Sequence, residues 1–498
     1  MRTSALAWRS LGTEDVLLLA AIVLLPWAFG GVEIWAYRSA ALLIMASASV
    51  ALWKRGWSPL RASRRLLPAF LLAGWGALQL VPLPPPALRW ASPEAHRLYV
   101  EAFPGYDGSA VSDPLQALEA QALERVPQAA AWPFPAEEVT PLALRAPDCM
   151  RERWRSLSVQ PSATLERLMW YMALLVAFLL LRARVAERER FVAYRWALFA
   201  VFAALALFAL VQFHFWNGRI YWVRLLLVQV HPFGPYFNPT NFAGVMELAV
   251  PWLAGFVWGR LRARRRSALY EAGFGIAAAS LVFCFVASVA SASKLAIVLI
   301  GAALFALGLL VARGWRARAV VTAVALSGFA GVALLAMDTR LAERFGMFFG
   351  RSGDLQLLEG RLVAWQASIA MLRDFPVTGV GFGALRELFQ SYLPPGAIDR
   401  WSHLHNDYLE VLVEGGIIAG VLIVWLACGY VSRVVRSLRP SDTVSPSRIG
   451  LALGILSLAI HAFFDFNHQI PANGLLWVAC CAMAFSSASG ARSRGAEP

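Results

Sequence analysis

Residues 191–214 read FVAYRWALFAVFAALALFALVQFH, an almost unbroken apolar run in which Arg195 is the one charged side chain. An α-helix rises about 1.5 Å per residue, so a run of this length crosses the roughly 30 Å hydrocarbon core of a bilayer. Across the chain, 59% of the residues are hydrophobic and the mean hydropathy is +0.57. A soluble fold does not bury that much apolar surface, so the bilayer is the expected solvent.

Runs of the same kind recur from one end of the sequence to the other. We therefore predict an all-α integral membrane protein with about twelve transmembrane helices. The predicted spans are 14–31, 36–53, 66–83, 165–182, 191–214, 240–259, 269–289, 293–312, 319–337, 413–432, 449–465 and 472–489. No small-residue cleavage site follows the first span, so we expect it to be retained rather than removed as a signal peptide.

Basic residues cluster at alternate ends of these spans. The clusters are Lys54, Arg55, Arg61, Arg64 and Arg65, then 182–195, then 260–266, then Arg313, Arg316 and Arg318, then Arg433, Arg436 and Arg439. Short cytoplasmic loops are rich in Lys and Arg, so the alternation predicts a multi-pass protein of the bacterial inner membrane with both termini cytoplasmic. The net charge of +14 follows from this topology. We expect membrane lipids, and no nucleic acid, as partners.

Two segments are too long and too polar to be simple turns, and this orientation places both in the periplasm. They divide the chain into N-terminal transmembrane helices (1–83), a first periplasmic loop (84–164), central transmembrane helices (165–337), a periplasmic catalytic loop (338–412) and C-terminal transmembrane helices (413–498). No Walker loop, dinucleotide fingerprint, zinc spacing or Asp-x-Asp pair is present, which disfavours an ATP-driven transporter. No cofactor and no metal are expected.

The second periplasmic loop carries the densest polar cluster of the predicted external surface. A helix pattern at 358–374 leads to a turn at 376–381, a helix at 383–392 and then WSHLHNDYLE at 401–410. Asn406 or Asp407 can cap a helix, and Gly415-Gly416 should end or kink it before the next span. We expect the apolar face of this helix, made of Tyr408, Val411 and Leu412 with Leu409 as a further candidate, to be its buried face. On this pattern alone, His403 and His405 could be interfacial residues that only form hydrogen bonds.

Five segments, in order, resemble the O-antigen ligase and O-antigen polymerase superfamily. They are FGPYFNPTNFAG at 233–244, RLVAW at 361–365, PVTGVG at 376–381, HNDYL at 405–409 with EGG at 414–416, and HAFFDFNHQIPAN at 461–473. Where members usually carry Ser-Arg at the outer end of a span, this chain has Ser293-Lys294. The ordered matches cover about residues 231–480.

The resemblance implies an inverting glycosyltransferase with a polyprenol-dependent, GT-C-like membrane architecture. Such an enzyme moves a glycan from an undecaprenyl-diphosphate-linked donor to an acceptor hydroxyl, on a glycan or a lipid A core, at the periplasmic face. His405 matches the histidine of the family motif, and a neutral imidazole can take the proton of an attacking hydroxyl.

The leaving diphosphate needs fixed positive charge, and candidates lie near the predicted membrane exits. The predicted diphosphate-binding residues are Arg361, Lys294 and Arg224. The predicted supporting residues are Asn406, Asp407, Glu414, Asn238 and Asn241. Each cation also has a structural interpretation, as a contact with lipid headgroups or a salt bridge within a folded periplasmic loop.

Other functions stay open at this stage. A ligase would transfer a finished polysaccharide to the lipid A core, whereas a polymerase would lengthen the lipid-linked chain. A protein O-oligosaccharyltransferase would share the same site. A non-catalytic flippase or permease for lipid-linked glycans predicts inverted repeats and ionisable residues buried within spans, and apart from His461 and Asp465 near one exit the predicted spans contain almost none.

Overall fold

The structure is a computed structural model that describes residues 8–60, 64–103, 106, 154–225, 232–262, 272–312, 314–323, 326–327, 351–394, 402–438 and 445–486. Its helices follow the apolar runs of the sequence. The first half holds α2 (Thr13–Leu24), α3 (Ile34–Arg55), α4 (Leu67–Gln79), α5 (Pro85–Ala91), α6 (Pro93–Ala102), α8 (Pro161–Arg184), α9 (Arg188–His214) and α10 (Pro239–Arg262). The second half holds α11 (Ala272–Ala290), α12 (Lys294–Val311), α16 (Arg351–Asp374), α17 (Leu385–Phe389), α18 (Asp407–Leu438), α19 (Pro446–His461) and α20 (Pro471–Ala484).

Strands are confined to two short antiparallel pairs within these ranges. Strand β1 (Pro82–Leu83) pairs with β2 (Arg155–Ser156), with Pro82 opposite Ser156. Strand β3 (Arg219–Ile220) pairs with β4 (Arg224–Leu225) in a hairpin. Both pairs lie where the chain leaves one long helix and returns to another.

Seven helices are long and apolar enough to cross a bilayer, which confirms the all-α, multi-pass membrane class. They are α3, α8, α9, α10, α11 from Gly273, α12 and α18 as far as Val435. The number twelve is not confirmed. Helices α2, α4, α19 and α20 coincide with four more predicted spans but are shorter, and most of the predicted span 319–337 lies outside the described residues.

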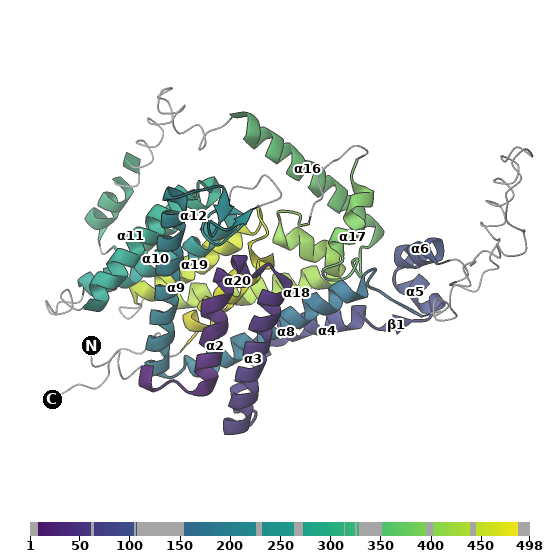
Figure 1. The fold of residues 1–498 in the computed structure, drawn as a ribbon, viewed down its shortest axis with the longest axis horizontal. Helices are drawn as coiled ribbons and strands as arrows, with labels where there is room; N and C mark the ends of the chain where they lie inside the picture. The colour runs from purple at the N-terminus through teal and green to yellow at the C-terminus, as the bar shows by residue number, and fades with distance from the viewer. Residues whose placement is uncertain are drawn as a thin grey trace, which may run out of the picture.

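Helix α10 is the most buried of these seven helices, with 78% of its most apolar 18-residue stretch buried, and it packs against α9, α11, α12 and α19 (Figure 1). Small residues let α19 approach it closely. A Cβ added at Gly450 would lie 2.0 Å from the Pro251 carbonyl oxygen, and one at Gly255 would lie 2.3 Å from that of Pro446. Such close backbone contact is how helices pack inside membranes, where apolar lipid supplies no hydrophobic driving force.

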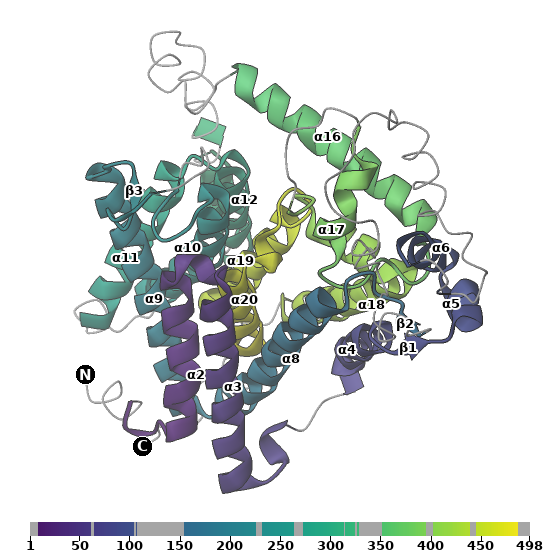
Figure 2. The ribbon, with the colours of Figure 1, turned by 45° about the vertical axis from the view of Figure 1, so that its right-hand side comes forward.

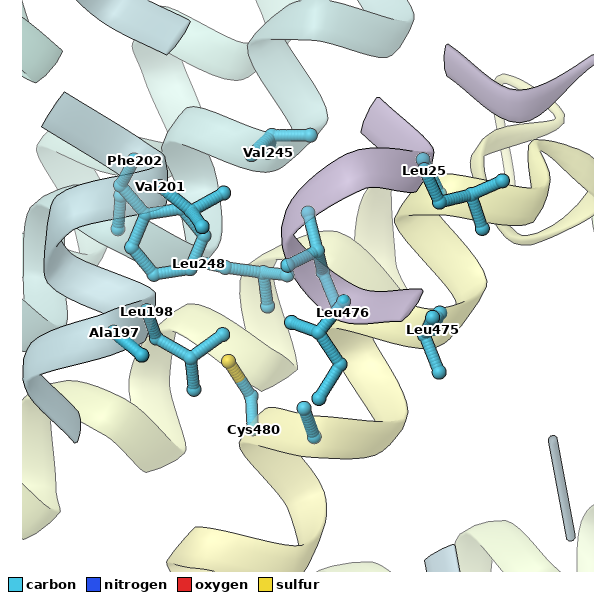
Figure 3. Close-up of a cluster of buried hydrophobic side chains, with 14 of the residues drawn as sticks. Leu25, Ala197, Leu198, Val201, Phe202, Val245, Leu248, Leu475, Leu476 and Cys480 are labelled. Atoms are coloured by element: carbon cyan, nitrogen blue, oxygen red, sulfur yellow. The ribbon is translucent and has the colours of Figure 1, made fainter. Parts of the chain in front are cut away.

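The apolar core joins helices from both ends of the chain. Figure 3 shows Leu198 and Phe202 of α9 facing Leu248 of α10, with Leu476 and Cys480 of α20 beside them. All five side chains are buried. Helix α20, the last helix of the described residues, therefore packs into the core, and the α19–α20 hairpin is held against α10.

An ionic network ties together α2, α3 and α8 at one end of the bundle. Arg184 Nε donates to Asp15 Oδ1 at 2.7 Å, and Lys54 Nζ donates to Glu14 Oε2 at 2.8 Å. Asp15 and Arg184 are almost completely buried. Lys54 and Arg184 belong to the basic clusters that predict the cytoplasmic side, so part of that charge also holds helices together.

The opposite end carries the two long polar segments, and we call it the external side. Of the first segment, the structure describes 84–103, 106 and 154–164; of the second, 351–394 and 402–412. Figure 2 shows α16 and α17 on the same side as α5 and α6. The two segments meet directly, because the Val159 amide donates to the Val380 carbonyl at 3.0 Å. They share a second apolar core that includes Leu88, Met371 and Phe389.

Candidate active site

The site is organised around the first turns of α18. Asn406 Oδ1 accepts hydrogen bonds from the Tyr408 and Leu409 amides, at 3.1 Å and 3.0 Å, so Asn406 is the helix cap that the sequence predicts. Gly416 has φ 65° and ψ −169°, which breaks the helix where the sequence predicts an end or a kink. The helix that approaches this break has nine residues, from Asp407 to Gly415.

The buried face of this short helix is not the predicted one. Tyr408, Val411 and Leu412 are only partly buried, whereas Asp407, Glu410 and Glu414 are almost completely buried. The prediction of an apolar buried face is therefore wrong. Burial of carboxylates costs free energy unless they are paired or hydrogen-bonded. The burial of the acidic face therefore indicates that these carboxylates have ionic or hydrogen-bonding partners on the inner side of the helix.

The PVTGVG turn packs on the helix break. The Gly381 amide donates to the Glu414 carbonyl at 2.9 Å, and the Ile417 amide donates to the Pro376 carbonyl at 2.9 Å. A Cβ at Gly416 would lie 2.0 Å from the Val377 carbonyl oxygen, which leaves room only for glycine. Two of the motifs that carry the family resemblance are thus joined backbone to backbone.

Four histidines pair with four buried carboxylates, each through Nδ1. The pairs are His403 with Glu410 (2.9 Å), His405 with Asp465 (3.2 Å), His461 with Glu247 (2.5 Å) and His468 with Asp407 (3.0 Å). None of the four carboxylate side chains is more than 6% exposed. The partners come from α10, α18 and the α19–α20 hairpin, so the cluster forms only when these elements meet.

His405 has the most constrained position of the four. Its φ of 50° lies in the left-handed region, which non-glycine residues seldom adopt. Its ring meets the edge of Phe466 at a centroid distance of 4.8 Å and an interplanar angle of 77°. Strained backbone held by its surroundings is common at functional sites.

Asp465 fixes the tautomer of His405. Burial alone raises the pKa of the Asp465 carboxyl, but the hydrogen bond and positive charge of His405, with the charge of His461, outweigh it and lower the pKa to about 2. The carboxylate also accepts hydrogen bonds from the Phe466 amide at 2.8 Å and from the Thr240 hydroxyl. An ionised carboxylate requires a proton on the facing Nδ1, so the lone pair of the neutral ring lies at Nε2.

Two of the predicted diphosphate-binding cations lie at the level of this cluster. The half-buried Arg361, on α16, is close enough for its charge to act on His461. Lys294 is exposed at the start of α12. Helices α12 and α19 run antiparallel, and the Ser457 hydroxyl donates to the Leu299 carbonyl at 3.5 Å. The first turn of α12 therefore lies beside the end of α19 at His461.

The third predicted cation has a different set of contacts. Arg224 Nη1 lies 2.6 Å from Glu33 Oε1, and its guanidinium stacks over Phe29 and Phe237 at 4.5 Å and 5.2 Å. These contacts match the alternative interpretation, in which the cation forms a structural salt bridge. They also place Arg224 beside Phe237 and Asn238, at the entry to α10.

The predicted supporting asparagines shape that entry. Asn238 Oδ1 accepts from the Thr240 amide at 2.9 Å, and Thr240 in turn contacts Asp465. The Asn241 carbonyl accepts from Asn473 Nδ2 at 2.8 Å, which joins α10 to α20. Both asparagines therefore act on the site through the elements that hold Asp465.

Three residues of the site were not predicted from the sequence. Asp465 was noticed as an ionisable residue but given no partner. Glu247 lies inside the predicted span 240–259, where an ionisable side chain is itself a signal of function. Arg167 lies in the first turns of α8 and donates to Gln469 Oε1 at 2.6 Å. No pattern in the sequence distinguishes Arg167 from the basic residues that flank other spans.

Comparison with known proteins identifies a protein family that part of this chain matches. Residues 279–424 match the O-antigen ligase family, a range that takes in Lys294, Arg361, His405 and the break at Gly416. The predicted resemblance to the O-antigen ligase and polymerase superfamily is therefore confirmed, in a chain whose helices make it a multi-pass membrane protein.

One curated relative is similar over part of its length. The chain is 27% identical over 161 residues to the exopolysaccharide production protein ExoQ of Rhizobium meliloti (strain 1021). The match covers 30% of this chain and 35% of ExoQ, so the chain spans about a third of the length of that relative.

Proposed function

We propose that this protein is an inverting glycosyltransferase of the O-antigen ligase and polymerase type. Its donor would be a glycan on undecaprenyl diphosphate, and its acceptor a sugar hydroxyl on a growing polysaccharide or a lipid A core. The single observation that carries the proposal is the pairing of His405 Nδ1 with the buried Asp465, where His405 lies within the residues 279–424 that match this family.

His405 would act as the general base of the transfer step. The acceptor oxygen attacks the anomeric carbon of the donor, and its proton moves to His405 Nε2 as the new C–O bond forms. The bond from the anomeric carbon to the diphosphate oxygen breaks with its electron pair, and the configuration inverts. Asp465 holds the imidazole in the required tautomer and stabilises the imidazolium that results.

Fixed cations would stabilise the leaving group. The diphosphate departs with additional negative charge, and preorganised positive groups favour that charge in the transition state. Arg361 and Lys294 supply it in this proposal because both lie at the level of His461. Arg224 contributes less directly, since Glu33 already neutralises it.

The cellular setting is part of the same proposal. The basic clusters favour an inner-membrane protein with cytoplasmic termini and a periplasmic active site. The name of the relative ExoQ is consistent with a polysaccharide product. The surface glycan of a deletion strain tests the function: long chains left unattached indicate a ligase, single repeat units indicate a polymerase, and an unchanged glycan contradicts the proposal.

A second candidate function is transport of a lipid-linked glycan. Glu247 and His461 form a buried pair inside apolar helices, as expected of a transport pathway. Purified protein with defined donor and acceptor in detergent separates the candidates. Formation of a glycosidic product there supports the transferase, because a detergent micelle has no second compartment to transport into.

A further inference from the structure

A polar pocket lies beside the His405 site, on the external side. Its volume is about 250 Å³, many times the ~10–15 Å³ that one water molecule needs. The exposed residues Arg386, Glu387 and Ser402 form its mouth. Glu410 and Glu414, from the buried face of α18, line its inner part together with the half-buried Arg167.

Glu414 has a carboxylate oxygen in this pocket that can accept further hydrogen bonds. Its side chain is almost completely buried, and its Oε2 atom has no hydrogen-bond partner in the described part of the chain. On Glu410, by contrast, each oxygen has a partner: one contacts His403 Nδ1 at 2.9 Å and the other accepts from the Leu404 amide at 3.0 Å. A buried carboxylate oxygen without a donor is costly, so a ligand that donates hydrogen bonds would be favoured at Glu414.

The charges of the pocket select against an anion. The lining holds three carboxylates, on Glu387, Glu410 and Glu414, and two guanidinium groups, on Arg167 and Arg386, while His403 is already paired with Glu410. A diphosphate would therefore meet carboxylates as well as cations here. A polyhydroxylated ring suits the same wall, because each hydroxyl both donates to carboxylates and accepts from guanidinium groups.

One aromatic ring joins the pocket to the base. His403, which lines the pocket, stacks on Phe466 at a centroid distance of 4.5 Å and an interplanar angle of 15°. His405 meets the same phenyl ring edge-on at 4.8 Å. The pocket wall at His403 and the imidazole of His405 are therefore linked through one phenyl ring, although His405 itself does not line the pocket.

We propose that this pocket binds a pyranose ring of the acceptor glycan, with the Glu414 carboxylate accepting hydrogen bonds from its hydroxyl groups. The inference rests on the proposed function, which it deepens by separating two subsites. The acceptor enters past Arg386 and Glu387, while the anionic donor lies on the side of Arg361 and Lys294.

The binding test uses the full chain in lipid nanodiscs and two probes. The first is the oligosaccharide released by mild acid from the surface polysaccharide of the producing strain, which carries no diphosphate. The second is inorganic pyrophosphate. Saturation-transfer NMR should show the oligosaccharide bound to the wild type and to His405→Ala, and pyrophosphate should not displace it.

Two pocket variants make the test specific. Glu414→Gln removes the acceptor charge, and Ser402→Trp blocks the mouth without altering a buried polar group. Each variant should weaken oligosaccharide binding roughly 10- to 100-fold. For Glu414→Gln this is the usual effect of losing a hydrogen bond to a charged group. Glu101→Gln changes an exposed carboxylate of α6 outside the pocket and should bind like the wild type. If Glu414→Gln does not fold, Ser402→Trp decides the result.

Kinetics separate this inference from the proposed function. In the transfer assay the pocket variants should raise the acceptor KM by the same factor and change kcat only a few-fold. Unchanged binding in both variants, or displacement of the oligosaccharide by pyrophosphate, would overturn the pocket assignment while His405-dependent transfer stands. Binding through the pocket without any transfer would overturn the proposed function instead.

Discussion

His405 Nδ1 lies 3.2 Å from Asp465 Oδ1, although 60 positions separate the two residues. The contact joins the start of α18 to the connection between α19 and α20. Close by, the Asp407 amide donates to the Ala462 carbonyl at 2.9 Å. His405 and Asp465 are therefore held by two chain segments that also bond backbone to backbone.

Asp465→Asn should lower the rate of glycan transfer on the order of 10²–10⁴-fold with little change in substrate binding. The amide keeps the shape of the side chain but no longer requires a proton on Nδ1, so the ring loses its fixed tautomer. Steady-state kinetics in detergent measure the effect. Asp374→Asn is the matched control, because Asp374 is an exposed aspartate of α16 that accepts from the Tyr392 hydroxyl. Equal activity of the two variants would remove Asp465 from the mechanism.

The same carboxylate makes a prediction about acid stability. The folded-state pKa of Asp465 is lowered from 3.8 to about 2, so its ionised form stabilises the fold above about pH 4. This contribution is lost as the pH falls through the folded-state value. The difference in Tm between the wild type and Asp465→Asn should stay nearly constant from pH 7 to 5 and shrink only below about pH 4. A difference that vanishes between pH 6 and 5 would contradict the lowered pKa.

Gly416→Ala should destabilise the protein by about 2 kcal/mol or more and abolish transfer. Its backbone conformation is open essentially only to glycine, and the added Cβ would lie 2.0 Å from the Val377 carbonyl oxygen. Gly429→Ala is the control on the same helix, since a Cβ there meets nothing within 4 Å. Tryptophan-fluorescence melting compares the two. Similar Tm values for both variants would show that the break does not hold the site together.

Local patterns were enough to predict much of this site. Asn406 as a cap, the break at Gly416 and the turn at 376–381 are set by residues close in sequence, and all three are confirmed. His405 was singled out through its motif, and its role stays a proposal. The class of fold followed from apolar length alone.

Pairings between distant segments could not be predicted. The link from Asp465 to His405 depends on how α19 and α20 pack, which one sequence does not encode in any local period. For the same reason the buried face of α18 was predicted as apolar, because Glu410 and Glu414 look like solvent-facing residues until His403 and Arg167 are placed beside them. Hydropathy did not reveal Glu247 either, because one carboxylate hardly lowers the mean hydropathy of a long apolar run.

Transfer should persist in excess chelator, because the proposal assigns leaving-group stabilisation to Arg361 and Lys294. Lys294→Arg should be tolerated, since it keeps the charge and adds a bidentate fork. Lys294→Ala should lose on the order of 10²-fold in rate, as for removal of one preorganised donor. The assay is product formation with and without EDTA. Loss of turnover in EDTA that magnesium or manganese restores would overturn the assignment.

The histidines of the site can be ranked by mutation. His403→Ala removes a ring that pairs with Glu410 and stacks on Phe466, so it should leave kcat nearly unchanged, whatever its effect on acceptor binding. His214→Ala changes an exposed histidine at the end of α9 and serves as the control for expression and folding.

His405→Ala should nearly abolish transfer while leaving membrane insertion and Tm close to those of the control. General-base assistance typically contributes about 10²–10⁴-fold, and no other imidazole faces Asp465 at hydrogen-bonding distance among the described residues. The same loss would follow if His405 bound the diphosphate, so the pH dependence of kcat must accompany the rate. A base gives activity that rises with pH to a plateau as the imidazole loses its proton, whereas a diphosphate-binding imidazolium gives activity that falls with pH. A folded His405→Ala protein that transfers glycan at the wild-type rate would remove His405, and with it the proposed site.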